Sequence, residues 1–151
     1  MIKILFVCHG NICRSPMAEF VMKDLVKKEG REKEFLIESA ATSTEEIGNP
    51  VHRGTRQKLA QFNISVSGKT ARQMTKKDYE EFDYIIAMDS FNTRNIARIV
   101  EDKDGKVSKL LNFAGEKGDI ADPWYTGNFD ETYDDILRGY KGLLKYLDKK
   151  K

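Results

Sequence analysis

The fold is decided by residues 2–16, which read IKILFVCHGNICRSP. The first six of these residues are apolar apart from one lysine, and such a run predicts a buried strand. A glycine-containing loop over residues 8–15, called loop 8–15 below, follows the strand. Pro16 is typical of the first position of a helix, and Ser15 stands where it can cap that helix. This stretch therefore predicts a strand, a short loop and a helix in direct succession.

Strands and helices continue to alternate along the rest of the chain. Apolar runs predict strands at residues 35–39, 84–88 and 107–111. Helices are predicted from Asn49-Pro50 towards Phe62, from Thr75, at residues 90–100, and over a last stretch with one apolar face, which carries Phe129, Tyr133, Ile136, Tyr140, Leu143 and Leu147. Repeated strand–helix units indicate an α/β fold, with a parallel sheet and helices on both faces, in a single domain over residues 1–151. Because ligands bind beyond the carboxyl ends of such strands, loop 8–15 lies where chemistry is expected.

The composition is that of an ordinary globular protein and excludes several classes. Its 26 lysine and arginine residues nearly balance 24 aspartate and glutamate residues, and the net charge of +2 does not favour a nucleic-acid partner. No apolar run approaches the roughly 18 residues that span a bilayer, and the opening apolar stretch is too short for the core of a signal peptide. We therefore expect a cytoplasmic protein without a membrane partner, and a monomer.

The two cysteines of the chain, Cys8 and Cys13, both lie in loop 8–15. They cannot build a disulfide framework, and without further cysteine or histidine partners they cannot form a structural zinc site. No metal is expected, and reactive chemistry explains the two residues better.

Loop 8–15 has the features of an anion-binding site. Its backbone N–H groups can point inward as a nest, and the positive end of the helix dipole adds to the potential there. A phosphate in this nest would lie against the sulfur of Cys8, and the same field stabilises a thiolate. Arg14 can bind two phosphate oxygens with its planar fork and hold the charge that builds in the transition state. A buried structural cysteine is the usual alternative, but the position of the loop directly after an apolar strand favours a nucleophilic Cys8.

Three other side chains of the loop have expected roles. The hydroxyl of Ser15 can donate a hydrogen bond to the thiolate. Asn11 can brace the loop by side-chain hydrogen bonds to its backbone. His9 is expected at the rim of the loop, without a catalytic role.

A general acid for an aryl leaving group is predicted in the loop before the last helix. Asp122 precedes Pro123, which stiffens the loop and favours an extended conformation at the aspartate. Trp124 and Tyr125 follow and offer flat faces that can wall a cleft for a phenyl ring. Asp89 competes for the role because it follows the third strand, but capping the next helix explains it equally well.

The chain resembles the low-molecular-weight protein tyrosine phosphatases over essentially its full length. Residues 8–16 match the signature Cys-x-Gly-Asn-x-Cys-Arg-Ser-Pro of that family. Residues 39–43, 71–73 and 82–85 match further segments of it, and residues 122–125 match its sequence of Asp-Pro followed by two aromatic residues.

The resemblance implies a four-stranded parallel sheet and a cysteinyl-phosphate intermediate that water hydrolyses. In it, Cys8 is the nucleophile, Arg14 is the phosphate clamp, and Asp122 acts first as acid and then as base. The implied set of substrate-binding and supporting residues comprises His9, Gly10, Asn11, Ile12, Cys13, Ser15, Trp124 and Tyr125, with Ser39 as a second brace of the loop. The resemblance implies no metal or organic cofactor, and its substrates are phosphotyrosine proteins or small aryl phosphates.

Four other functions compete with this one. The related arsenate reductases need further cysteines, and none follows Cys13. The related arginine phosphatases carry a threonine where this chain has Ile12, which favours phosphotyrosine. A phosphate-binding module would need neither the thiol nor the acid, and both are present. A redox sensor based on a disulfide between Cys8 and Cys13 is expected only as regulation added to the enzyme, with Cys13 as the redox partner.

The chain departs from the family pattern at two positions. Glu45 stands where members often place an aromatic wall of the cleft, which affects the expected substrate preference. Lys69 lies where many members carry a histidine near the signature loop, and this residue is expected to change how the loop is braced.

Overall fold

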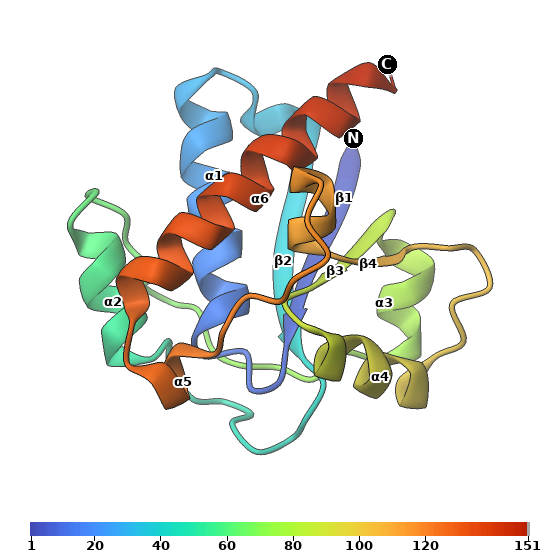
Figure 1. Ribbon diagram of the computed structural model, residues 1–151, viewed down its shortest axis with the longest axis horizontal. Helices are drawn as coiled ribbons and strands as arrows, with labels where there is room; N and C mark the ends of the chain where they lie inside the picture. Colours follow the sequence, from blue (N-terminus) through green and yellow to red (C-terminus); the bar gives the residue numbers. More distant parts are fainter. Residues whose placement is uncertain (151) are drawn as a thin grey trace.

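A parallel sheet of four strands forms the centre of the computed structural model, which describes residues 1–150 (Figure 1). The strands lie in the order β2-β1-β3-β4. Their bounds are Ile2–Cys8 for β1, Phe35–Ala41 for β2, Tyr84–Ala87 for β3 and Val107–Lys109 for β4. All three neighbouring pairs are parallel, so the carboxyl ends of the strands meet at one edge of the sheet.

Helices cover both faces of this sheet, as the alternation of elements predicted. The α-helices are α1 (Arg14–Lys28), α2 (Arg53–Ala60), α3 (Lys76–Glu81), α4 (Ser90–Ile99), α5 (Pro123–Thr126) and α6 (Phe129–Lys149). Short 3₁₀ helices occupy Glu32–Glu34 and Leu110–Ala114. In Figure 1, α6 crosses α1 on one side of the sheet, while α3 and α4 lie on the other side. Within residues 1–150, no helix combines the length and the apolar character needed to cross a membrane.

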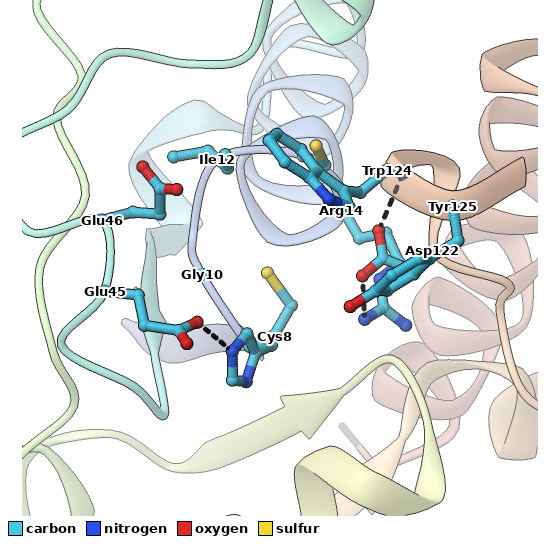
Figure 2. A pocket seen from close by; sticks show the side chains of 11 residues that line it. Cys8, Gly10, Ile12, Arg14, Glu45, Glu46, Asp122, Trp124 and Tyr125 are labelled. Carbon is cyan, nitrogen blue, oxygen red and sulfur yellow. Dashed lines mark hydrogen bonds and ion pairs between the residues drawn. The ribbon is translucent and has the colours of Figure 1, made fainter. Parts of the chain in front are cut away.

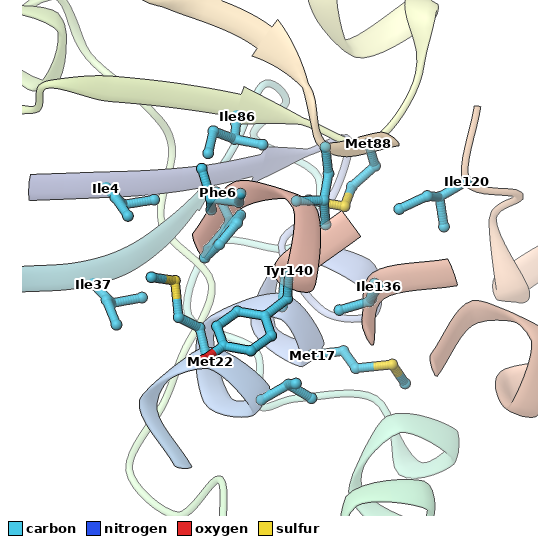
Figure 3. Packing of buried hydrophobic residues seen from close by; sticks show 14 of the residues in the cluster. Ile4, Phe6, Met17, Met22, Ile37, Ile86, Met88, Ile120, Ile136 and Tyr140 are labelled. Atoms are coloured by element: carbon cyan, nitrogen blue, oxygen red, sulfur yellow. The ribbon is translucent and has the colours of Figure 1, made fainter. Parts of the chain in front are cut away.

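The alternation of side chains along β1 explains why two cores form. Ile4 and Phe6 point to the core shared with α1 and α6, whereas Leu5 and Val7 belong to the core on the opposite face. Figure 3 shows the first of these cores, in which Tyr140 of α6 packs among residues from β1 and α1. A strand that is buried on both faces reads as a continuous apolar run, which is what the sequence contains.

Two predicted helix starts were wrong. The helix predicted from Asn49-Pro50 begins instead at Arg53, and a ring nitrogen of His52 caps it by accepting a hydrogen bond from the backbone N–H of Gly54 at 3.0 Å. Pro50 pairs with Thr70 in an isolated antiparallel bridge. This long-range pairing overrides the local signal of an asparagine before a proline.

Ser15 does not cap the first helix either. The helix begins at Arg14, Cys13 is the N-cap residue without a side-chain cap, and Ser15 lies inside the first turn. Its hydroxyl faces Cys8 rather than the backbone of the helix. The strand predicted to reach residue 111 is also shorter, because the chain turns into a 3₁₀ helix after Lys109.

Candidate active site

A cavity of about 410 Å³ opens at the carboxyl edge of the sheet, above loop 8–15 (Figure 2). The side chain of Cys8 points into it from the end of β1. Its lining residues are Cys8, His9, Gly10, Ile12, Cys13, Arg14, Glu45, Glu46, Asp122, Trp124 and Tyr125. The volume suits a small ligand or one side chain of a larger one. Of the residues predicted from the sequence, only Asn11, Ser15 and Ser39 are absent from this lining, and all three are buried around the loop.

Buried polar contacts hold the loop from below. Asn11 adopts a left-handed conformation with φ of 58°, and its side-chain amide donates to the hydroxyls of Ser15 at 2.8 Å and Ser39 at 2.9 Å. The amide oxygen accepts the backbone N–H of Arg72 at 3.2 Å. Asparagine tolerates this backbone conformation better than most residues. The sequence predicted that Asn11 bonds to the backbone of the loop, but these contacts reach side chains and a distant segment instead.

The two cysteines have different surroundings. The Cys8 sulfur lies 3.0 Å from the Ser15 hydroxyl and accepts the backbone N–H of Asn11 at 3.3 Å. Burial, together with the negative charges of Cys8 and Asp122, raises the pKa of the Cys13 thiol to about 12. Cys13 therefore remains a thiol at neutral pH, although it lines the same cavity as Cys8.

Arg14 is buried at the start of α1 and is held by three oxygens. It donates to the Asp89 carboxylate at 2.6 Å, to the carbonyl of Ile120 at 2.8 Å and to Asp122 at 3.4 Å. Burial works against its charge, but the negative charge of Cys8 and the bond to Asp89 raise the pKa of Arg14 above its ordinary value. The guanidinium thus stays charged beside the sulfur.

Asp89 caps the next helix, which is one of the two roles that the sequence left open, and it also binds Arg14. One carboxylate oxygen accepts the backbone N–H of Asn92 at 2.7 Å and caps α4, while the other binds Arg14. Its place two residues after the end of β3, at the carboxyl edge of the sheet, is the sequence signal that points to this contact.

Asp122 lines the cavity on the same side as Trp124 and Tyr125. One of its oxygens accepts the backbone N–H of Trp124 at 3.0 Å and caps α5, and the other faces Arg14. Its side chain is 25% exposed, so a ligand or water in the cavity can reach the carboxylate. The backbone at Asp122 is extended, as the following proline predicted.

The aromatic wall is largely open to solvent. Trp124 is 55% exposed and Tyr125 is 84% exposed. The ring of Trp124 contacts the ring of His52 edge-on at 5.4 Å, and His52 stacks on Phe129. The sequence did not identify His52 as a support for this wall, because the contact joins segments that lie far apart in the chain.

The rim of the cavity across from this aromatic wall carries charged side chains. Glu45 and Glu46 line the cavity there, and the carboxylate of Glu45 binds the ring of His9. Both partners are exposed, His9 by 50% and Glu45 by 67% of their side chains. His9 therefore lies at the rim, where the sequence predicted it.

The site combines a thiol, a guanidinium and a carboxylate around one cavity, and this set suits an anionic ligand. Across the described part of the chain, no cluster of three or more histidine, cysteine or acidic side chains is arranged to hold a metal ion.

Known proteins are similar to this chain in sequence and in structure. The family model described as low molecular weight phosphotyrosine protein phosphatase matches residues 3–151. The low molecular weight protein-tyrosine-phosphatase YfkJ of Bacillus subtilis is 42% identical over 154 aligned residues, which cover 100% of this chain and 99% of that protein. Its crystal structure superposes with a TM-score of 0.95 and covers 100% of this chain and 97% of its own.

Two further solved structures widen the comparison. The solution structure of the low molecular weight protein tyrosine phosphatase from Campylobacter jejuni is 49% identical, has a TM-score of 0.77, and covers 99% of this chain and 97% of its own. The crystal structure of DARP, a Drosophila arginine phosphatase, is 28% identical with a TM-score of 0.88, and covers 97% of this chain and 98% of its own.

Proposed function

The chain belongs to the low-molecular-weight family of protein-tyrosine phosphatases, which are phosphoric monoester hydrolases, and from this membership we propose how its own residues carry out the reaction. Phosphotyrosine binds with its phosphate in loop 8–15 and its ring against Trp124 and Tyr125. Cys8 is the nucleophile, Arg14 the phosphate clamp and Asp122 the general acid and base. The observation that carries this proposal is that all three side chains line one cavity of about 410 Å³.

In the first step, the Cys8 thiolate attacks phosphorus, so that a bond from sulfur to phosphorus forms while the bond from phosphorus to the tyrosyl oxygen breaks. Asp122 gives its proton to that oxygen, which leaves as a neutral phenol. Arg14 holds two oxygens of the phosphoryl group with its planar fork and offsets their charge. The charge of Arg14 is supported by its raised pKa beside Cys8 and Asp89.

In the second step, water attacks the cysteinyl phosphate and inorganic phosphate leaves. The Asp122 carboxylate accepts a proton from this water, and the sulfur departs as a thiolate. The Ser15 hydroxyl, 3.0 Å from the sulfur, donates a hydrogen bond to the thiolate as it leaves. No metal or organic cofactor takes part in the proposed reaction.

The remaining phosphate-binding and rim residues have supporting roles in this proposal. Gly10, Ile12 and Cys13 line the wall of the cavity beside the nucleophile. His9 closes the rim, and Asn11 with Ser39 braces the loop. Residues 1–151 act as one phosphatase domain, and we propose that it works as a monomer in the cytoplasm on phosphotyrosine proteins or small aryl phosphates.

A protein-arginine phosphatase is the second candidate, because the Drosophila arginine phosphatase DARP shares the fold with a TM-score of 0.88. Ile12 argues against it. Its side chain lines the cavity with aliphatic groups, and these offer no hydrogen-bond partner to a guanidinium next to the phosphate.

The test compares phosphotyrosine, phosphoserine and phosphoarginine peptides of one sequence as substrates. We expect a strong preference for phosphotyrosine, and we expect Ile12→Thr to shift the ratio of kcat/KM values towards phosphoarginine. A rapid acid quench during turnover of p-nitrophenyl phosphate should trap a phosphoryl group on the peptide that contains Cys8. Robust turnover of phosphoarginine by the wild type would overturn the substrate, and a trapped group on any other residue would overturn the mechanism.

A further inference from the structure

A buried ion pair lies behind loop 8–15 and outside the cavity. Glu19 of α1 has 4% of its side chain exposed, and Lys69 has 13% exposed. The Lys69 ammonium donates to the backbone carbonyl of Ser39 at 2.8 Å and lies 3.5 Å from the Glu19 carboxylate. Burying a carboxylate is costly unless it is paired and hydrogen-bonded, and the proposed reaction gives neither residue a role.

The Glu19 carboxylate is connected to Cys8 by three side chains. Ser39 lies 2.5 Å from Glu19 and bonds to the Asn11 amide at 2.9 Å. The same amide bonds to Ser15 at 2.8 Å, and Ser15 lies 3.0 Å from the Cys8 sulfur. All three connecting residues are at most 1% exposed, so no bulk water competes for these bonds.

The hydrogens in this series of hydrogen bonds can be counted, because each hydroxyl group has only one. An ionised Glu19 only accepts, so Ser39 must give it its single hydrogen. Ser39 can then only accept from Asn11, and the amide must therefore turn its NH₂ group towards both serines.

The backbone N–H of Arg72 favours the same orientation of the amide. It donates to the amide oxygen of Asn11, and a flipped amide would set an N–H group against it. Ser15 therefore accepts from Asn11 and keeps its own hydrogen for Cys8.

We propose that Glu19 and Lys69 are positioning residues, which act through Ser39, Asn11 and Ser15 to keep a hydrogen bond directed at the Cys8 sulfur. This inference rests on the proposed function only in taking Cys8 as the nucleophile. If Glu19 lost its charge, Ser39 would be free to turn its hydrogen towards Asn11. The amide could then flip, and Ser15 could give its hydrogen to the amide oxygen instead of the thiolate.

Lys69 is the buried cation that faces the Glu19 carboxylate. Burial lowers the pKa of Lys69, and the Glu19 carboxylate opposes that change. The other cations nearby are Arg72, which pairs with Asp78 and Glu38, and Lys23. Lys23 contacts the other oxygen of Glu19 at 2.5 Å, from a position that is 44% exposed.

Lys23 therefore provides a matched control for Lys69. Both lysines contact one carboxylate, but Lys69 contacts the oxygen that accepts from Ser39, and it is the buried one. Lys23→Met removes a solvent-screened charge, whereas Lys69→Met removes the buried one. An exposed pair contributes little, so the two variants should differ clearly.

The experiment measures the rate of Cys8 alkylation by iodoacetamide against pH, in the wild type, Glu19→Gln, Lys69→Met and Lys23→Met. We expect the midpoint of this curve to rise by about one pH unit in Glu19→Gln, which is a tenfold change in the thiol–thiolate equilibrium. Lys69→Met should shift it in the same direction and Lys23→Met should leave it near the wild-type value. The turnover of p-nitrophenyl phosphate at neutral pH should fall in Glu19→Gln and in Lys69→Met, and it should stay near the wild-type value in Lys23→Met.

Ser39→Ala keeps the inference falsifiable if Glu19→Gln does not fold, because it cuts the same connection without leaving a buried charge unpaired. Its midpoint should rise by a similar amount, and adding Glu19→Gln to it should cause no further rise. Midpoints that equal the wild type in Lys69→Met and Ser39→Ala, with lower thermal stability alone, would overturn the proposal. Alkylation requires no turnover, so this result is separate from a failure to trap the phosphoenzyme, which would instead overturn the proposed function.

Discussion

The base and the rim of the cavity are built in opposite ways. At the base, Asn11 and Ser15 are buried and every hydrogen of their side chains has a partner. At the rim, Trp124, Tyr125 and Glu45 are exposed and are held by few contacts. A buried network fixes one geometry, whereas exposed side chains can change without disturbing it. We infer from this difference that the nucleophilic chemistry belongs to the base and that the choice of substrate belongs to the rim.

Changes at the base should therefore lower kcat for every substrate, and changes at the rim should act mainly on KM for peptides.

The largest effect is expected for Cys8→Ser. A serine hydroxyl is not ionised at neutral pH, so turnover should fall to the background. Phosphate or tungstate should still bind, because we expect backbone N–H groups of loop 8–15 to supply most of the donors. Isothermal titration with tungstate checks the binding, and more than trace activity in this variant would contradict a thiolate mechanism.

Asp122→Asn comes next, because this residue belongs to the chemistry but stands at the edge of the rim. The loss of a positioned acid should lower kcat by about 10²–10⁴-fold for substrates with poor leaving groups. For p-nitrophenyl phosphate, whose leaving group hardly needs a proton, the loss should be much smaller. The alkaline limb of the kcat profile should also disappear.

Asp119→Asn is the matched control for this variant. Asp119 lies three residues earlier but binds Lys109 at 2.9 Å, and the cavity above loop 8–15 does not include it. It should leave the ratio between the two kinds of substrate unchanged. Equal losses on good and poor leaving groups in Asp122→Asn would exclude that residue as the acid.

The base could be predicted from the sequence because its parts lie close together in the chain. A strand, a loop and a helix are encoded within residues 2–16, and a parallel sheet was predicted from the repeated strand–helix units. What the sequence could not predict are the contacts between distant segments. Because Pro50 pairs with Thr70, α2 begins later in the chain than predicted. The ion pair between Glu19 and Lys69 also joins distant segments and lies behind loop 8–15.

The role of Ser15 could not be predicted from its neighbours in the sequence alone. A serine before a proline is a good helix cap in isolation, yet its hydroxyl bonds Asn11 and Cys8 instead. The hydroxyl of Ser15 bonds to the buried network at the base and is therefore not available to cap the helix. The sequence alone does not show this competition, because the network forms only in the folded protein.

The third prediction uses the contrast between the two cysteines of the base. The pKa of Cys13 is raised to about 12, so this residue is protonated at all physiological pH values and reacts slowly by itself. Brief treatment with iodoacetamide at neutral pH should therefore modify Cys8 alone, as peptide mapping can establish. Peroxide should convert Cys8 to a sulfenic acid, which Cys13 then captures as a disulfide.

In Cys13→Ser, dithiothreitol should accordingly recover markedly less activity than in the wild type after the same exposure to peroxide. The substitution should have a smaller effect on kcat before oxidation than Cys8→Ser or Asp122→Asn. Equal recovery in both proteins would show that no protective disulfide forms.

The smallest effect is expected at Glu45, which stands where the resemblance to the family led us to expect an aromatic wall. Glu45 lines the cavity and binds His9. It places a negative charge where the phosphate dianion enters. A like charge at an exposed site costs under about 1 kcal/mol and is screened by salt. Trp124 is then the main stacking surface for the substrate ring.

Glu45→Tyr should raise kcat/KM for phosphotyrosine peptides by less than about tenfold, chiefly by lowering KM, with the largest gain for peptides with acidic flanks. Glu45→Gln separates the two causes, because it removes the charge without adding a ring. If repulsion dominates, both variants should gain at low salt and converge with the wild type as salt rises. If stacking dominates, only the tyrosine variant should gain, and salt should not remove the gain. An unchanged KM in both variants, for acidic-flanked and basic-flanked peptides alike, would mean that the rim at Glu45 takes no part in choosing the substrate.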